Sequence, residues 1–164
     1  MLKGTAHKFG DSISTDHIIP GRYAHLRSNL PELAKHVLED ADVEFVNKVK
    51  KGDFVVGGSN FGLGSSREHA PLVIKMAGVS AILAKSFARI FFRNAINLGL
   101  PVLICDTDQI NDGDELEIDL AAGTIKDITN SAELTFGKIP DVMLKILDEG
   151  GLIPYIKNYG DFKL

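Results

Sequence analysis

The sequence predicts an α/β fold with a mostly parallel central sheet and a hairpin region towards its C-terminal end. Three short apolar runs, DFVVGG, VSAILA and LPVLICD, have the length of buried strands. Two segments with helical patterns separate them, and strands that alternate with helices form parallel sheets joined by right-handed crossovers. From Asp112 onwards, turn residues separate short alternating runs, a pattern typical of antiparallel hairpins.

The elements before DFVVGG are short. An alternating pattern predicts a strand over residues 3–8, followed by a loop over residues 14–16. The run LPELAKHVLEDA has Pro31 at its entry and apolar residues on one face, so it predicts a short helix. EFVNKVKKGD predicts a second helix that ends at Gly52.

Two longer helices are expected between the apolar runs. PLVIKMAG predicts a helix that ends near Gly78. SFARIFFRNAINLG has Ser86 as its expected N-cap and Gly99 as its end, and its apolar stripe consists of Phe87, Ile90, Phe91 and Ile96. The chain then finishes with a helix from about Pro140, a break at Gly150 and Gly151, and another short helix.

The composition bounds the class of protein. With 164 residues, the chain fits a single domain over residues 1–164. Its net charge of −4 and its pI near 5.7 give no basic surface for nucleic acid, so we expect no such partner. No apolar run approaches the length needed to span a membrane, and the first residues lack the apolar core of a signal peptide, so we expect a cytoplasmic protein.

The stretch GGSNFGLGSSREHAP, residues 57–71, places a glycine loop between a strand and a helix. Exposed backbone N–H groups and a helix N-terminus favour a bound anion. The two common nucleotide loops do not fit: no lysine follows Gly64, and Arg67 stands where a dinucleotide loop has its third glycine. The sequence therefore indicates an anion site that is not a nucleotide site.

The role of Ser65 and Ser66 depends on where the next helix begins. Ser65 and Glu68 have the spacing of a capping box. Pro71 would then lie inside the helix, so we expect a helix start near residues 67–70, with both hydroxyls in the loop. A serine among N–H groups is where an alkoxide is least costly, and Arg67 can clamp a carboxylate. These residues suggest proton abstraction from, or addition to, a small carboxylate, with capping as the alternative.

Three motifs resemble one family. NFGLGSSREHA resembles the serine loop of the swivelling domain of the aconitase superfamily. FGDSISTDHIIPGRY and AKSFARIFFRNAINLGLPVL are similar to two signatures of its free-standing form, the small subunits of 3-isopropylmalate dehydratases, in the group shared by archaeal-type isopropylmalate and homoaconitate enzymes. The resemblance covers nearly the whole chain and implies a swivelling β/β/α-type domain.

The resemblance implies a hydro-lyase that interconverts 2-isopropylmalate and 3-isopropylmalate by dehydration and rehydration in leucine biosynthesis. It also implies a large subunit that carries a 4Fe–4S cluster, in a heterodimer or heterotetramer, and a small chain that binds no metal or cofactor and is inactive alone. The single cysteine, Cys105, agrees, because such clusters need several thiolates. We expect Cys105 itself to be buried and structural rather than reactive.

The resemblance also assigns roles to residues. Ser65 matches the proton-abstracting serine, with Asp16 near that site; Ser66 and Arg67 match its carboxylate-binding neighbours, and Thr15 is a further substrate contact. The segment RYAHLRSNL corresponds to the part that reads the variable arm of the substrate. Its Leu26 offers apolar contact and its Arg27 offers charge.

Several alternatives stay open. Homoaconitate and 2,3-dimethylmalate are the other substrates considered, and the other class of function is a non-catalytic anion-binding module. Arg27 is either a specificity residue or a solvated arginine. For His17 and Arg22 we favour structural roles. Arg89 and Arg93 lie one helical turn apart, and we expect salt bridges and surface charge in preference to contact with a partner subunit.

Overall fold

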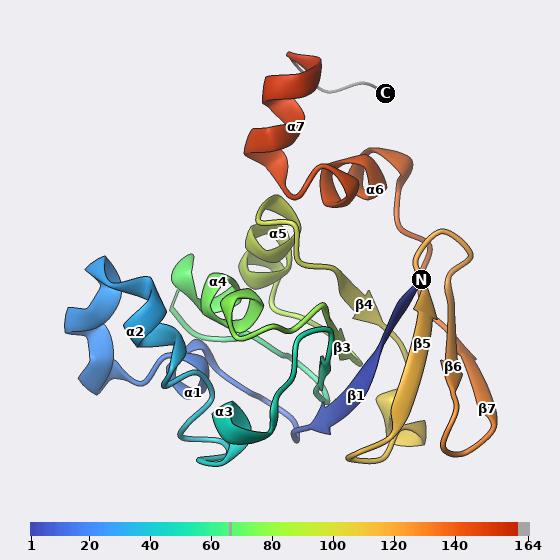
Figure 1. The fold of residues 1–164 in the computed structure, drawn as a ribbon, viewed down its shortest axis with the longest axis horizontal. Helices are drawn as coiled ribbons and strands as arrows, with labels where there is room; N and C mark the ends of the chain where they lie inside the picture. The colour runs from blue at the N-terminus through green and yellow to red at the C-terminus, as the bar shows by residue number, and fades with distance from the viewer. Residues whose placement is uncertain (66, 161–164) are drawn as a thin grey trace.

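The computed structural model describes residues 1–65 and 67–160 (Figure 1). Within these residues a seven-stranded sheet has the order β4-β3-β2-β1-β5-β6-β7. The strands are β1 (Leu2–Lys8), β2 (Phe54–Val56), β3 (Ala81–Ala84), β4 (Val102–Ile104), β5 (Glu115–Asp119), β6 (Thr124–Asp127) and β7 (Ala132–Thr135). The helices are α1 (Thr15–Ile18), α2 (Leu30–Ala34), α3 (Phe45–Lys48), α4 (His69–Met76), α5 (Arg89–Asn97), α6 (Asp141–Asp148) and α7 (Leu152–Tyr159), with 3-10 helices η1 (Gly21–Ser28) and η2 (Thr107–Gln109).

The sheet has a parallel half and an antiparallel half, which confirms the predicted fold class. Strands β1 to β4 are parallel neighbours in chain order, with α4 between β2 and β3 and α5 between β3 and β4. Strand β5 pairs with the other edge of β1, and β6 and β7 follow as antiparallel neighbours. The hairpin region therefore continues the central sheet rather than standing apart from it.

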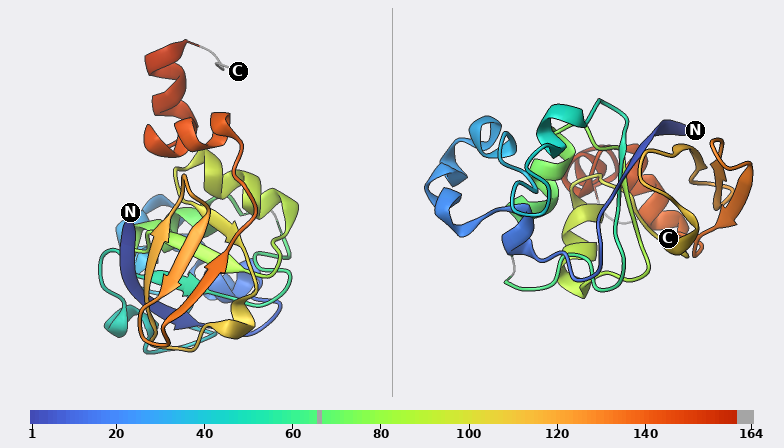
Figure 2. Two further views of the ribbon diagram at one scale, coloured as in Figure 1. Left: turned by 90° about the vertical axis from the view of Figure 1, so that its right-hand side faces the viewer. Right: turned by 90° about the horizontal axis from the view of Figure 1, so that it is seen from below.

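Alternate residues of the parallel strands build two cores, because successive side chains of a strand point to opposite faces. Val55 and Ile82 belong to the core that the helices cover. Phe54 and Leu83 belong to a second core, which they share with Ile118 and other residues of the antiparallel strands. The sheet thus curls so that β5, β6 and β7 cover the face that the helices leave open (Figure 2).

Three predictions about the first helices need correction. The loop expected over residues 14–16 is the start of α1, with Ser14 as its N-cap. The helix expected in LPELAKHVLEDA ends at Ala34, because the chain turns to bury Leu38, which has φ +58° and donates its N–H to the carbonyl of Ile18. The next helix ends at Lys48 and not at Gly52, since the backbone is already extended at Val49.

Other helix ends agree with the sequence more closely. Pro140 precedes α6, and Gly151 separates α6 from α7, as expected. The N-cap of α5 is Ala88 and not Ser86. The hydroxyl of Ser86 instead accepts a hydrogen bond of 2.7 Å from the backbone N–H of Asn60. That hydrogen bond ties the loop after β3 to the glycine loop after β2.

Candidate active site

Three loops meet where the parallel strands β1, β2 and β3 end. The N–H of Thr15 donates to the carbonyl of Leu63 at 2.8 Å, which joins the loop after β1 to the glycine loop. The N–H of Phe61 donates to the carbonyl of Ser86 at 3.0 Å, which joins the glycine loop to the loop after β3. Ligands of open α/β sheets bind at the carboxyl ends of the strands, so this edge is the expected place for a site.

Two glycines shape the glycine loop. Gly62 has φ +84°, and a Cβ atom there would lie 2.3 Å from Cγ of Phe91, so only glycine lets the loop pack directly on α5. Gly64 has φ +105°, and a Cβ atom there would lie 3.2 Å from Oγ1 of Thr15. The close packing on both sides fixes the position of the next residue, Ser65.

Ser65 lies in the loop and does not cap a helix. Helix α4 begins at His69 with Glu68 as its N-cap, no side chain caps it, and Pro71 lies in its first turn. The predicted helix start is confirmed, and the capping-box alternative for Ser65 is excluded. Ser65 is exposed, and its hydroxyl makes no hydrogen bond within residues 1–65 and 67–160. Ser66 lies outside the described residues.

The backbone carbonyl of Ser65 accepts two hydrogen bonds, although its hydroxyl makes none with the described residues. Its carbonyl accepts a hydrogen bond of 3.0 Å from the hydroxyl of Thr15 and one of 2.9 Å from the N–H of Arg67. Thr15 is buried, so its hydroxyl is a fixed donor. The structure thus brings Thr15 and Ser65 together, with the threonine behind the loop and the serine hydroxyl on its open side.

Arg67 is fixed by the loop after β1. One guanidinium N–H donates to the carbonyl of Ile19 at 2.6 Å, and the other terminal nitrogen lies 2.6 Å from Oδ1 of Asp16. The side chain of Asp16 is 69% exposed, and that of Arg67 is 31% exposed. Because a guanidinium has five donors, those not used here remain for a ligand. Asp16 and Arg67 are thus brought into one ion pair next to Ser65.

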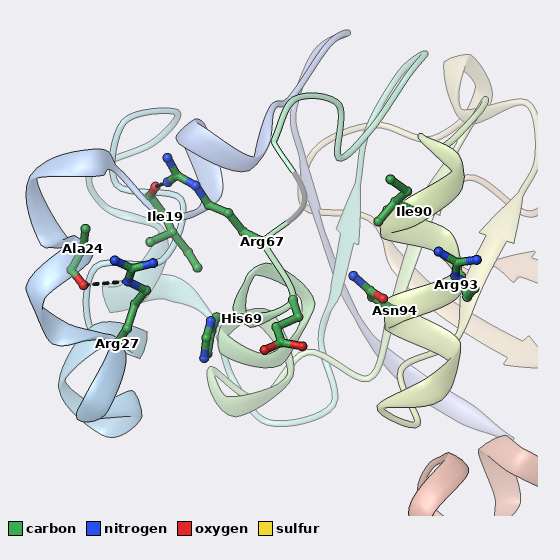
Figure 3. Close-up of a pocket in the computed structure, with 9 residues that line it drawn as sticks. Ile19, Ala24, Arg27, Arg67, His69, Ile90, Arg93 and Asn94 are labelled. Carbon is green, nitrogen blue, oxygen red and sulfur yellow. Dashed lines mark hydrogen bonds between the residues drawn. The ribbon is translucent and has the colours of Figure 1, made fainter.

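Two adjoining cavities lie beside these residues. Ser65, Thr15, Gly64 and the first turn of α5 line a cavity of about 210 Å³. A larger cavity of about 460 Å³ opens next to it, and Figure 3 shows Arg27 and Arg67 on one side of it and α5 on the other. Arg67, Ile90 and Asn94 line both cavities. A small carboxylate at Ser65 would therefore have space for its further substituents in the larger cavity.

The two candidate specificity residues of η1 have different surroundings. Arg27 is exposed and lines the larger cavity, and its Nε donates to the carbonyl of Ala24 at 3.0 Å. Leu26 is half-buried and packs against the helix-covered core. The fold therefore brings Arg27 and Arg67 to one cavity, whereas Leu26 of the same 3-10 helix is turned towards the core.

His17 and Arg22 have the structural roles that the sequence suggested. Nδ1 of His17 accepts a hydrogen bond of 2.9 Å from the N–H of Ser14 and so completes the cap of α1. The guanidinium of Arg22 lies 2.7 Å from Asp40 and stacks over the ring of Tyr23. This ion pair lowers the pKa of Asp40, chiefly through the hydrogen bond from Arg22.

Sequence reasoning missed part of the cavity wall, namely His69, Ile90 and Asn94. The sequence placed Ile90 in the apolar stripe of α5, and this is wrong: Ile90 is 44% exposed, whereas Phe91 and Ile96 of the same stripe are buried. The salt bridges expected of Arg89 and Arg93 are wrong within the described part of the chain: both side chains are exposed and neither has an ion pair there, because no acidic side chain of α5 faces them.

The side chains described do not suit an iron–sulfur cluster. No group of three or more His, Cys, Asp or Glu residues among them is arranged to hold a metal ion. Cys105 is buried, as expected, and burial raises the pKa of its thiol to about 12, so a thiolate ligand is disfavoured there. Over the same residues, no helix combines the length and hydrophobicity that crossing a membrane requires.

The chain is similar to proteins of one family over nearly its whole length. Residues 15–107 match the model of the aconitase C-terminal domain. The 3-isopropylmalate dehydratase small subunit 2 of Archaeoglobus fulgidus is 66% identical, over 99% of both chains. The isopropylmalate/citramalate isomerase small subunit of Methanocaldococcus jannaschii is 51% identical, over 96% of this chain and 95% of that protein.

A solved structure is also similar over nearly the whole chain. The crystal structure of 3-isopropylmalate dehydratase (leuD) from Methanocaldococcus jannaschii has a TM-score of 0.92 and 48% sequence identity, and the match covers 97% of this chain and 95% of that chain. The chain therefore belongs to the aconitase C-terminal domain family. Within that family it groups with the small subunits of 3-isopropylmalate dehydratases.

Proposed function

We propose that this chain is the small subunit of a 3-isopropylmalate dehydratase, a hydro-lyase of leucine biosynthesis that supplies a serine base and carboxylate-binding groups to a large subunit. The observation that carries the proposal is the exposed Ser65 hydroxyl, which has no partner among the described residues and stands beside the fixed guanidinium of Arg67. A non-catalytic anion-binding module would have no use for an unengaged hydroxyl held in this way.

In the proposed mechanism, Ser65 removes the proton from a carbon next to a substrate carboxylate, and Arg67 binds that carboxylate through two parallel hydrogen bonds. The first turn of α5 lines the same cavity, and no side chain among the described residues caps it, so its N–H groups favour negative charge on Ser65. Asp16 and the carbonyl of Ile19 orient Arg67, while Thr15 orients the peptide of Ser65. Rehydration returns the proton from Ser65 to the substrate.

The hydroxyl group that leaves needs an electrophile, and a 4Fe–4S cluster on the large subunit would supply it. The side chains of residues 1–65 and 67–160 do not suit such a cluster, and we propose that it lies on the partner. The partnership follows the names of the relatives, which are small subunits. We propose that residues 1–164 act as one swivelling domain in a heterodimer or heterotetramer in the cytoplasm.

The candidate substrates differ in one substituent, and we propose which residues contact it and which bind the common carboxylate. Ser66 would join Arg67 at the carboxylate, as its place in the motif implies. Leu26 and Arg27 would read the substituent that differs between malates, because η1 borders the larger cavity. The name of one relative adds citramalate to isopropylmalate. Homoaconitate and 2,3-dimethylmalate carry different arms and belong in the same comparison.

The proposal is tested by anaerobic co-expression with the large subunit, followed by assays of 2-isopropylmalate, citramalate, homocitrate and 2,3-dimethylmalate. We expect the assembled enzyme to turn over isopropylmalate and either chain alone to be inactive. Arg27→Ala should change the ratio of kcat/KM values among the four substrates, whereas Arg22→Ala, in the same segment but paired with Asp40, should not. No turnover of any malate by the assembled complex would contradict the proposed function.

A further inference from the structure

We propose that Arg89, Ile90 and Arg93, on one exposed face of α5, form the surface on which the large subunit docks. We call these residues the docking ridge. The partner surface that fits it has an apolar contact for Ile90 with acidic side chains on both sides. This inference rests on the proposed function, because it assumes that a second polypeptide completes the site.

No acidic side chain of the described residues pairs with the arginines of the docking ridge. Arg22, Arg27 and Arg67 each donate to an acidic side chain or a carbonyl. Arg89 and Arg93 have no such partner among residues 1–65 and 67–160, although the whole chain has a net charge of −4. Helix α5 also begins with Arg89, with no acidic residue in its first turn and no side-chain cap, so the positive end of the helix adds to the same charge.

Ile90 gives the docking ridge an apolar centre. It is 44% exposed, although large apolar side chains of this helix, such as Phe91, are otherwise turned into the core. Arg89 precedes it, and Arg93 follows about one turn later, so the three side chains share one face. An apolar residue flanked by arginines is a composition enriched at the centres of protein interfaces.

The position of the docking ridge specifies its occupant. Ile90 and Arg93 line the larger cavity (Figure 3). Ile90 also lines the cavity of Ser65, together with Arg89. Ser65 is exposed, and the described residues hold no metal-ligand group beside it. Any polypeptide that brings a metal to Ser65 must therefore cover the rim of these cavities, which includes the docking ridge. Arginine also pairs well with carboxylates at such a rim.

The test measures the affinity of the large subunit for variants of this chain, by calorimetry at two salt concentrations. Arg89→Glu, Arg93→Glu and Ile90→Ser should each raise Kd by about tenfold or more. The arginine variants should also reduce the salt dependence of Kd, because fewer ion pairs form. The first control is Lys51→Glu, because the exposed Lys51 lies before the N-terminal end of β2, whereas the glycine loop follows its C-terminal end. The second control is Ile153→Ser, which replaces an exposed isoleucine of α7. Both variants should bind the large subunit with the Kd of the original chain.

The outcomes separate this inference from the proposed function. Ser65→Ala should bind the large subunit with the Kd of the original chain but lose turnover, whereas the docking ridge variants should raise Kd. Unchanged Kd values for all three ridge variants, with normal circular dichroism, would overturn the docking ridge alone. Normal affinity with lost turnover would assign these residues to the substrate and also overturn it. If the original chain did not bind the large subunit, the proposed function would fail as well.

Discussion

Replacement of Gly62 by alanine tests how the glycine loop is packed. The added Cβ atom would lie 2.3 Å from Cγ and 2.5 Å from Cβ of Phe91, and both distances are far shorter than a van der Waals contact between carbon atoms. The backbone at Gly62 also has φ +84°, which costs an L-residue about 1–2 kcal/mol. Displacing a packed ring adds about 1–3 kcal/mol, so the free energy of unfolding should fall by about 2–5 kcal/mol.

Urea denaturation measures this loss. With a slope of about 2 kcal/mol per M, the midpoint should fall by about 1–2.5 M. The matched control is Gly10→Ala, since Gly10 has no atom within 4 Å of an added Cβ and is not among the glycines with positive φ. The double variant Gly62→Ala with Phe91→Leu separates the two contributions, because the smaller side chain should reduce the coupling between the sites.

The loop should also lose activity, because relief of the overlap moves the segment that ends at Ser65. We expect kcat of the assembled enzyme to fall more in Gly62→Ala than in Gly10→Ala. If the two alanine variants unfolded at the same urea concentration, the loop would not pack on α5 as described, and the reasoning about the position of Ser65 would be refuted.

Three further predictions concern buried titratable groups. Asp53 is buried, which raises its pKa, but the hydrogen bonds from His7, Lys50 and Thr5 outweigh this effect, and the pKa is lowered overall. Asp53 should therefore stabilise the fold above the ordinary carboxylate pKa, and this stabilisation should be lost as the pH falls through the lowered pKa. Asp53→Ala should lower the free energy of unfolding at pH 7 by about 3–5 kcal/mol, and an unchanged value would contradict the role of these hydrogen bonds. Asp127 has a raised pKa because of burial and the adjacent Asp114, so its carboxyl group stabilises the fold at low pH and loses this effect as the pH rises through the raised value. Asp127→Asn should hence raise the urea midpoint of unfolding at pH 8 but not at pH 3. A lower midpoint at pH 8 would contradict this, because it would mean that the charged form of Asp127 beside Asp114 stabilises the fold. Cys105, with its pKa raised to about 12, should not react with a thiol reagent at pH 8 until the chain unfolds, and labelling of the folded chain would disprove its burial.

Patterns of local sequence predicted most of the fold. The three apolar runs are the parallel strands β2, β3 and β4, and the turn-rich segment after Asp112 forms β5, β6 and β7. Pro71 correctly located the start of α4, because its constraint on a helix is local. The early helices were predicted less well, since the positive φ at Leu38 serves tertiary burial and leaves no local signal.

The site was predicted only in part, because some of its contacts join residues that are far apart in the sequence. Ser65, Arg67, Thr15 and Asp16 were singled out from the motifs, and the structure brings them to one edge of the sheet. The dependence of Arg67 on the carbonyl of Ile19 could not be predicted, because that hydrogen bond joins residues 48 positions apart. Arg89 and Arg93 likewise have no ion pair within the described part of the chain, and the local sequence could not show which acidic side chains the fold would place near them.

The central claim is that the Ser65 hydroxyl removes a proton from substrate, and the rate of the assembled enzyme tests it most directly. Ser65→Ala should lower kcat by about 10²–10⁴-fold with subunit assembly intact. Ser59→Ala removes another exposed hydroxyl of the same loop and should leave kcat near that of the original enzyme. A Ser65→Ala enzyme that kept its full rate would contradict the account.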